Sequence, residues 1–184
     1  MSLIPPWDAL HPLVVHFPIA LLIVAPLFVV AALVWRRGSS WLLIAALAIM
    51  VLGTIGALLA VSTGESAGEL AERTPAVAAV LEEHEELAET TRNVFLGLTA
   101  LFAAVVVASH VLPRRWGSRM RPGVLPALQI VFLALYGGGV VLLVNAAHQG
   151  GRLVHEFGVT AMLSPSAQPG PPPIERTAAH GDDD

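Results

Sequence analysis

Residues 9–35 read ALHPLVVHFPIALLIVAPLFVVAALVW, a stretch without Asp, Glu, Lys or Arg. Three later stretches share this property: residues 41–62, 94–109 and 124–147. A helix needs roughly 20 mostly apolar residues to cross the hydrocarbon core of a bilayer, so these stretches predict membrane-spanning helices. The whole chain of 184 residues is 55% hydrophobic, with a mean hydropathy of +0.70. Soluble core helices would show polar faces at helical spacing, which these stretches lack.

The sequence therefore predicts an all-α integral membrane four-helix bundle. Its spans are expected at about residues 12–35, 41–62, 92–111 and 124–148. They belong to a single transmembrane domain, residues 1–163. Residues 164–184 contain a PGPPP run and end in DDD. Such a segment lacks the apolar content to pack, so we expect a disordered, Pro-rich extracytoplasmic tail.

The arginines predict the orientation, because the chain contains no lysine. The links between the first two spans and between the last two hold Arg36, Arg37, Arg114, Arg115, Arg119 and Arg121. Short loops rich in positive charge stay in the cytoplasm. Both termini and residues 63–91, expected to form an acidic loop, then face outward. The chain is expected to be a multi-pass protein of the cytoplasmic (inner) membrane, with both termini outside.

Five histidines gather on the outer side of the predicted bundle. His11 and His16 lie at the start of the first span, His84 precedes the third, and His148 and His155 follow the fourth. A rise of about 1.5 Å per residue places His16 and His148 just inside the membrane boundary and the others about 7 to 15 Å further out. Polar groups at membrane depth are costly and normally mark a functional site in the bundle interior. The pattern predicts an outward-facing cofactor or metal site.

The absence of cysteine limits the kinds of cofactor that the chain can bind. It excludes thiolate metal sites, cysteine-ligated clusters and covalently attached haem. A b-type haem needs only two imidazoles from facing helices and an apolar slot between them. One or two haems b, with iron ligands among His16, His84, His148 and His155, are therefore expected. A bare Cu, Zn or Fe ion held by three imidazoles such as His11, His84 and His155 is the alternative.

Two motifs carry a resemblance to a known family. HPLVVHFPIALL at residues 11–22 and AHQGGRLVHEFGV at residues 147–159, with an acidic, histidine-containing segment between them, resemble the bacterial and archaeal small four-helix membrane proteins of domain of unknown function 2231. The resemblance covers about residues 9–163. The family has no established activity, but its members resemble predicted haem-binding membrane proteins and some are joined to Rieske or cytochrome domains. Carried over by position, the implied site residues are His11, His16, His84, His148 and His155, with Gly150, Gly151 and Arg152 as the turn that positions the last histidine.

We therefore expect a b-type haem-binding membrane protein that passes electrons between the membrane and an extracytoplasmic electron carrier or a larger membrane redox complex. Arg152 is the expected partner of the haem propionates. A transition-metal-binding membrane protein and a structural accessory subunit are the other two hypotheses. No phosphate loop, dinucleotide fingerprint, nucleophile elbow or nucleic-acid-binding stripe is present. The chain is thus expected to be an electron-transfer protein or subunit rather than a stand-alone enzyme. It is expected to contact membrane lipid and no nucleic acid, and an oligomer is possible.

Overall fold

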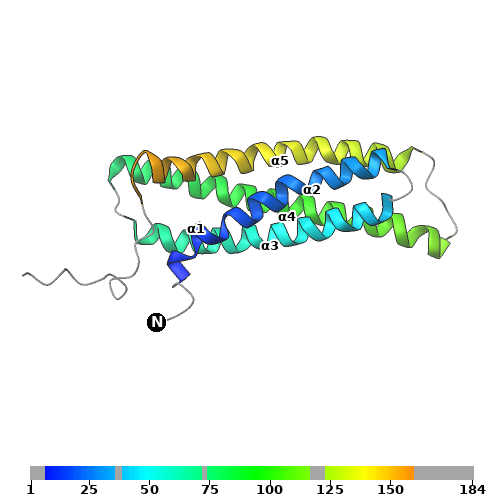
Figure 1. Cartoon of the computed structure of the whole chain (residues 1–184), viewed down its shortest axis with the longest axis horizontal. Helices are drawn as coiled ribbons and strands as arrows, with labels where there is room; N and C mark the ends of the chain where they lie inside the picture. The colour runs from blue at the N-terminus through cyan, green and yellow to red at the C-terminus, as the bar shows by residue number, and fades with distance from the viewer. Residues whose placement is uncertain (1–6, 36–38, 72–73, 117–122, 160–184) are drawn as a thin grey trace, which may run out of the picture.

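The computed structural model describes residues 7–35, 39–71, 74–116 and 123–159, except the side chains of Asp8 and of residues 110–116. The elements in chain order are η1 (Trp7–Ala9), α1 (His11–Val14), α2 (His16–Val34), α3 (Ser39–Glu69), α4 (Pro75–Trp116) and α5 (Val124–His155). Figure 1 shows the long helices side by side along one axis. Four helical segments, the first of them α1 with α2, are long and apolar enough to cross a membrane. The chain is an all-α four-helix membrane bundle, as the sequence predicts. The predicted tail, residues 164–184, lies outside the described residues.

The bundle consists of two helical hairpins. In the first hairpin α1 and α2 pack against α3, and in the second α4 packs against α5. Contacts of α3 with α4 and of α2 with α5 join the hairpins. The starts of α1 and α4 therefore meet the ends of α3 and α5 at one end of the bundle, on the left in Figure 1. We call this the histidine end, because it carries His11 and His84. Below, "inward" means along the bundle axis, away from the histidine end.

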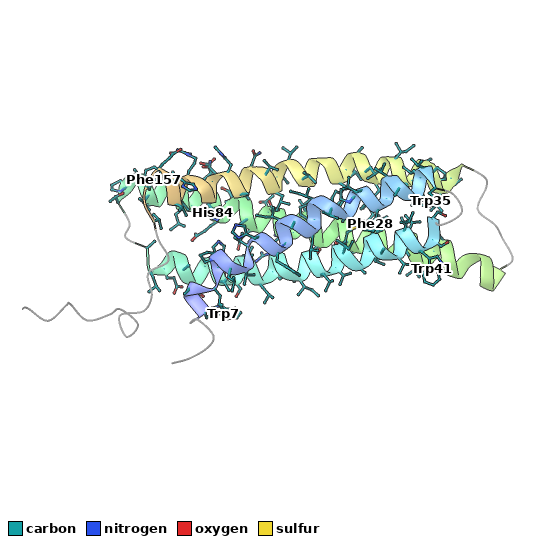
Figure 2. The ribbon with its side chains drawn as sticks, viewed as in Figure 1. Trp7, Phe28, Trp35, Trp41, His84 and Phe157 are labelled. Atoms are coloured by element: carbon teal, nitrogen blue, oxygen red, sulfur yellow. The ribbon has the colours of Figure 1, made fainter. Side chains whose placement is uncertain are left out.

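Exposed tryptophans mark the opposite end of the bundle. Trp35 and Trp41 are 70% and 78% exposed, and Figure 2 shows both at the end remote from His84. Aromatic side chains of this kind concentrate where a membrane meets water. Between the two ends the lipid-facing surface is apolar, with Leu27, Ile130 and Val141 all exposed.

The acidic segment expected to be a loop is mostly helical. α3 continues to Glu69 and α4 begins at Pro75, so the predicted spans lie within longer helices. The segment is rich in Glu, Ala and Leu, which are strong helix formers. Thr74 caps α4, because its Oγ1 accepts a hydrogen bond of 3.3 Å from the N–H of Val77, and proline is favoured at the first helical position. As a result His84 lies on a helix that projects beyond the apolar stretch.

Two prolines shape the first span. Pro18 has no N–H to donate to the carbonyl of Val14, which is where α1 ends. Val15 keeps helical backbone angles, with φ −60° and ψ −31°. The proline therefore interrupts the helical hydrogen bonds between α1 and α2, while the backbone continues in a helical conformation. Pro26 likewise leaves the carbonyl of Leu22 without its helical donor.

Buried polar side chains tie the helices together. The hydroxyl of Tyr136 on α5 donates a 2.7 Å hydrogen bond to the carbonyl of Leu22 on α2, the one that Pro26 leaves free. Thr54 on α3 and Thr99 on α4 share a 2.8 Å hydrogen bond between their hydroxyls. Backbone groups at membrane depth must be satisfied within the protein, so these bonds stabilise the packing of α2 with α5 and of α3 with α4.

Candidate functional site

Two of the five predicted histidines meet at the histidine end. The ring centroids of His11 on α1 and His84 on α4 lie 6.4 Å apart, with an angle of 79° between the ring planes. Each residue comes from a different hairpin, so the pair bridges the two halves of the bundle. Both side chains are partly buried.

Each of the two imidazoles is oriented by a backbone carbonyl of its own hairpin. Nδ1 of His11 lies 2.9 Å from the carbonyl oxygen of Ala60 on α3. Nδ1 of His84 lies 2.9 Å from the carbonyl oxygen of Ala146 on α5. A carbonyl can only accept, so each Nδ1 carries the proton and each Nε2 keeps a free lone pair. This is how ligating histidines are usually held, with one nitrogen donating to a carbonyl and the other facing the metal.

Glycines leave room for both rings. A Cβ built on Gly64 would lie 3.0 Å from Cε1 and 3.1 Å from Nδ1 of His11, and one built on Gly150 would lie 3.0 Å from Cε1 of His84. A side chain at either position would therefore push against the ring. Each glycine comes four residues after the alanine whose carbonyl accepts the histidine hydrogen bond, in AVSTG and AAHQG. The two hairpins thus provide equivalent half-sites: a histidine near the start of one helix, and an alanine carbonyl with a glycine near the end of the other.

A cavity of about 670 Å³ surrounds the histidine pair and is lined by residues of all four long helices. Its inward floor includes Pro18, Ala57 and Leu143, and small residues line much of its walls. Its acidic lining residues are Glu65, Glu82, Glu85, Glu86 and Glu89. The cavity is therefore apolar in depth and negatively charged around the histidines.

Two polar residues of α4 line the cavity inward of His84. Among the described residues, Oγ1 of Thr91 is the one buried side-chain polar atom without a hydrogen-bond partner, and Thr91 is only 4% exposed. The neighbouring Arg92 is the one arginine or lysine among the described lining residues. Its Nη2 lies 3.8 Å from Oε1 of Glu89, and its Nε donates a 3.2 Å hydrogen bond to Oδ1 of Asn93.

The other predicted histidines lie on the exposed surface. His16 is exposed, and its Nδ1 contacts the carbonyl oxygen of Pro12 at 2.9 Å. His148 and His155 are exposed on α5 and do not line the cavity described above. The structure therefore does not bring His11, His84 and His155 together as a three-imidazole site. Among the described residues, no group of three or more His, Cys, Asp or Glu side chains is placed to hold a metal ion.

Arg152, the expected propionate partner, lies outside the cavity lining. Its Nε lies 3.1 Å from Oε2 of Glu156 and its Nη1 donates a 2.9 Å hydrogen bond to Oε1 of Gln149. The arginine that lines the cavity is Arg92.

Sequence reasoning missed the backbone carbonyls of Ala60 and Ala146, and it missed Thr91. The available signal for the carbonyls was the repeated spacing of alanine and glycine near the end of the second helix of each hairpin. Thr91 follows His84 by seven residues and so shares its helix face.

A family model described as "Predicted membrane protein (DUF2231)" matches residues 7–162. The chain belongs to this family, as the two motifs indicated. No curated protein and no solved structure matches the chain.

Proposed function

We propose that this member of the DUF2231 family binds one haem b between His11 and His84 and transfers electrons between the membrane and an extracytoplasmic partner. The observation that carries the proposal is the separation of the two oriented imidazoles. Haem, when bound, supplies one-electron transfer. The chain's own part is to hold the ligands, enclose the cofactor and present a docking surface.

The separation of the two rings fits two ligands on opposite sides of one metal. An imidazole nitrogen lies about 2 Å from a bound metal, and the ring centroid about 1 Å further. Two imidazoles in line therefore have centroids about 6 Å apart, while a tetrahedral angle would bring them to about 5 Å. The observed 6.4 Å agrees with the in-line arrangement.

The surroundings also fit a haem. Cofactor pockets usually measure about 300 to 1,000 Å³, and the cavity falls within that range. Gly64 and Gly150 leave space for the two rings, because a Cβ at either position would lie 3.0 Å from a ring atom. The chain has no cysteine, so attachment would be non-covalent.

A bare transition-metal site is supported less well. Structural zinc sites take four protein ligands and catalytic ones take three. The described residues place only two imidazoles together. Haem iron would need only two ligands from the protein, and His11 and His84 would hold it.

The negative charge of the histidine end suggests the partner. Exposed carboxylates on α3 and α4 include Glu65, Glu69, Glu82, Glu83 and Glu86. Such a surface attracts a basic electron carrier and speeds its encounter. With the arginine-rich links in the cytoplasm, this end faces outward from the cytoplasmic membrane, and the partner is an extracytoplasmic carrier or a redox complex.

The test is the optical spectrum of the detergent-purified protein and of four single variants. We expect a low-spin spectrum of a bis-histidine haem, with pigment that acid and organic solvent extract completely. His11→Ala and His84→Ala should convert the spectrum to high spin or lower the haem content at least about tenfold. His16→Ala and His148→Ala, the matched controls at exposed positions, should keep both.

The ligand role is separated from a folding role by His84→Met, which offers a thioether in place of the imidazole and should raise the reduction potential while haem is retained. Colourless protein with stoichiometric copper or zinc would favour the bare-metal hypothesis. Loss of haem from His16→Ala and His148→Ala, with retention by His11→Ala and His84→Ala, would overturn the ligand assignment.

A further inference from the structure

We propose that haem reaches the histidine pair sideways from the membrane, through an opening between α1 and α5, rather than from the water beyond the histidine end. The proposal rests on the proposed haem-binding function and adds the route by which the cofactor enters and leaves. Two features of the same cavity carry it: an apolar cluster covers its end, and one of its sides is open.

A second cluster of packed apolar residues covers the cavity at the histidine end. Leu81 and Leu153, which line the cavity, belong to it, and they lie three residues further toward the histidine end than His84 and Gly150. The cluster, which we call the apolar cap, joins the start of α4 to the end of α5. Its buried members and the residues packed against them are Val77, Val80, Leu81, Leu153, Ala71, Phe157 and Val159.

The chain after α5 turns back to complete the apolar cap. Gly158 has φ +65°, a left-handed conformation that glycine adopts readily. The N–H of Val159 then donates a 2.9 Å hydrogen bond to the carbonyl of Leu153. Figure 2 shows Phe157 beyond His84, at the histidine end. Packed apolar side chains therefore lie between the water at this end and the histidine pair.

On one side, the same cavity has no helix packed across it. Among the described residues, α1 packs against η1, α2 and α3, and no Cα of α1 lies within 8 Å of a Cα of α5. Figure 1 shows α1 beside α3, with α2 crossing toward α5. Further inward α2 and α5 meet, where the Tyr136 hydroxyl joins them. Residues on both edges of the gap line the cavity, Pro12 and Val15 on one edge and Ala147 and Val154 on the other.

The edges of this side opening are apolar. Pro12, Ala147 and Val154 are exposed although they line the cavity. Neither they nor Val15 carry a charge or a side-chain hydrogen-bonding group. Apolar surface of this kind is favoured in contact with lipid chains over water. The opening therefore suits an apolar ligand that arrives from the membrane.

The inner part of the side opening lies at membrane depth. Ile19 of α2 and Leu143 of α5 line the cavity there. At about 1.5 Å per residue, they lie about 24 and 28 Å from Trp35 and Val124 at the opposite end of the bundle. The hydrocarbon core is about 30 Å thick, so lipid chains reach this level. A porphyrin is a large apolar ring that prefers lipid to water, and this route avoids the acidic surface of the histidine end.

The experiment measures the rates of haem uptake and release by the full chain in phosphatidylcholine vesicles. Ala147→Trp, which narrows the side opening, should slow both rates at least about tenfold and leave the Kd unchanged, because a barrier on the route changes both rates by the same factor. Ala134→Trp, the matched control at an exposed position of α5 outside the cavity lining, should keep both rates. Leu81→Ala, which loosens the apolar cap, should not speed uptake. Thermal unfolding of each apoprotein checks that the variants fold.

A second measurement does not depend on haem. The chain has no cysteine, so Ala147→Cys can carry a single fluorescent label in the apoprotein. Brominated lipids should quench this label. The same label on Glu83→Cys, an exposed position of α4, should be quenched by iodide in the water instead.

Three results would overturn the proposal and leave the haem-binding function intact. Unchanged rates in Ala147→Trp, or faster uptake in Leu81→Ala, would show that haem enters from the histidine end. Slower uptake without slower release in Ala147→Trp would place this residue in the bound site rather than on the route. Quenching of the Ala147→Cys label by iodide alone would show that the side opening faces water. Failure of the unaltered protein to bind haem would overturn the function and this route with it.

Discussion

At the residue scale, the contact of Tyr136 with Leu22 shows how a proline inside a membrane span is accommodated. Pro26 removes the N–H that would bond to the Leu22 carbonyl, and an unsatisfied carbonyl is costly at membrane depth. The Tyr136 hydroxyl replaces the missing donor at 2.7 Å from a helix far away in the sequence. The proline and the tyrosine therefore act as a pair.

We predict that Tyr136→Phe destabilises the protein by about 1 kcal/mol, because the Leu22 carbonyl then lacks any donor. In a Pro26→Ala background the backbone N–H restored at position 26 satisfies that carbonyl. The same tyrosine substitution should then cost close to nothing. Unfolding of the two single variants and the double variant in detergent measures the coupling energy. An equal cost in both backgrounds would mean that the hydroxyl stabilises the bundle for another reason.

The histidine pair shows, also at the residue scale, what a sequence does and does not reveal. The sequence predicts five histidines on one side of the membrane, and in the structure they lie near the starts of α1, α2 and α4 and near the end of α5, toward the histidine end. It did not distinguish His11 and His84 from the exposed His16, because neighbouring positions on a helix face different directions by 100° per residue. The acceptors that orient the pair are backbone carbonyls, which every residue type possesses. Residue identity alone therefore leaves the pairing open.

At the element scale, α4 extends far beyond the apolar stretch that predicted it. The four spans could be predicted because lipid requires long uninterrupted apolar runs. The apolar pattern does not predict the outer part of α4, because no apolar run continues there, although Glu and Ala favour helices and Thr74 with Pro75 forms a helix start. Because this part of α4 is helical, it sets the position of His84 along the bundle axis relative to His11.

We predict that Glu83→Pro is strongly destabilising although Glu83 is exposed. Proline here removes a helical hydrogen bond and clashes with the preceding turn, at a cost of about 3 kcal/mol or more. Glu83→Ala, which removes the same side chain, should change stability by less than about 0.5 kcal/mol. Thermal unfolding and protease sensitivity of the two variants are the measurements. A fully tolerated proline would mean that this segment is a loop.

At the scale of the whole molecule, the bundle is two hairpins that each contribute half of one site. The first hairpin supplies His11, the Ala60 carbonyl and Gly64, and the second supplies the same three features from α4 and α5. Each hairpin also has its own arginine-containing link, with Arg36 and Arg37 in the first. The positive-inside tendency therefore acts on each half separately. Neither half alone brings His11 and His84 together.

We predict that residues 1–73 and 74–184, expressed together as two chains, reassemble. The two halves should copurify in detergent, because contacts between α3 and α4 and between α2 and α5 do not require the connecting segment. Within the proposed function, the pair should bind haem with the spectrum of the intact protein, and His84→Ala in the second half should abolish that spectrum. A reporter at the end of the first half should be extracytoplasmic, because both ends of each hairpin lie on one side. Halves that insert but fail to copurify would show that the connecting segment is needed to hold the bundle together. A reporter found in the cytoplasm would show that the histidine end faces the cytoplasm instead.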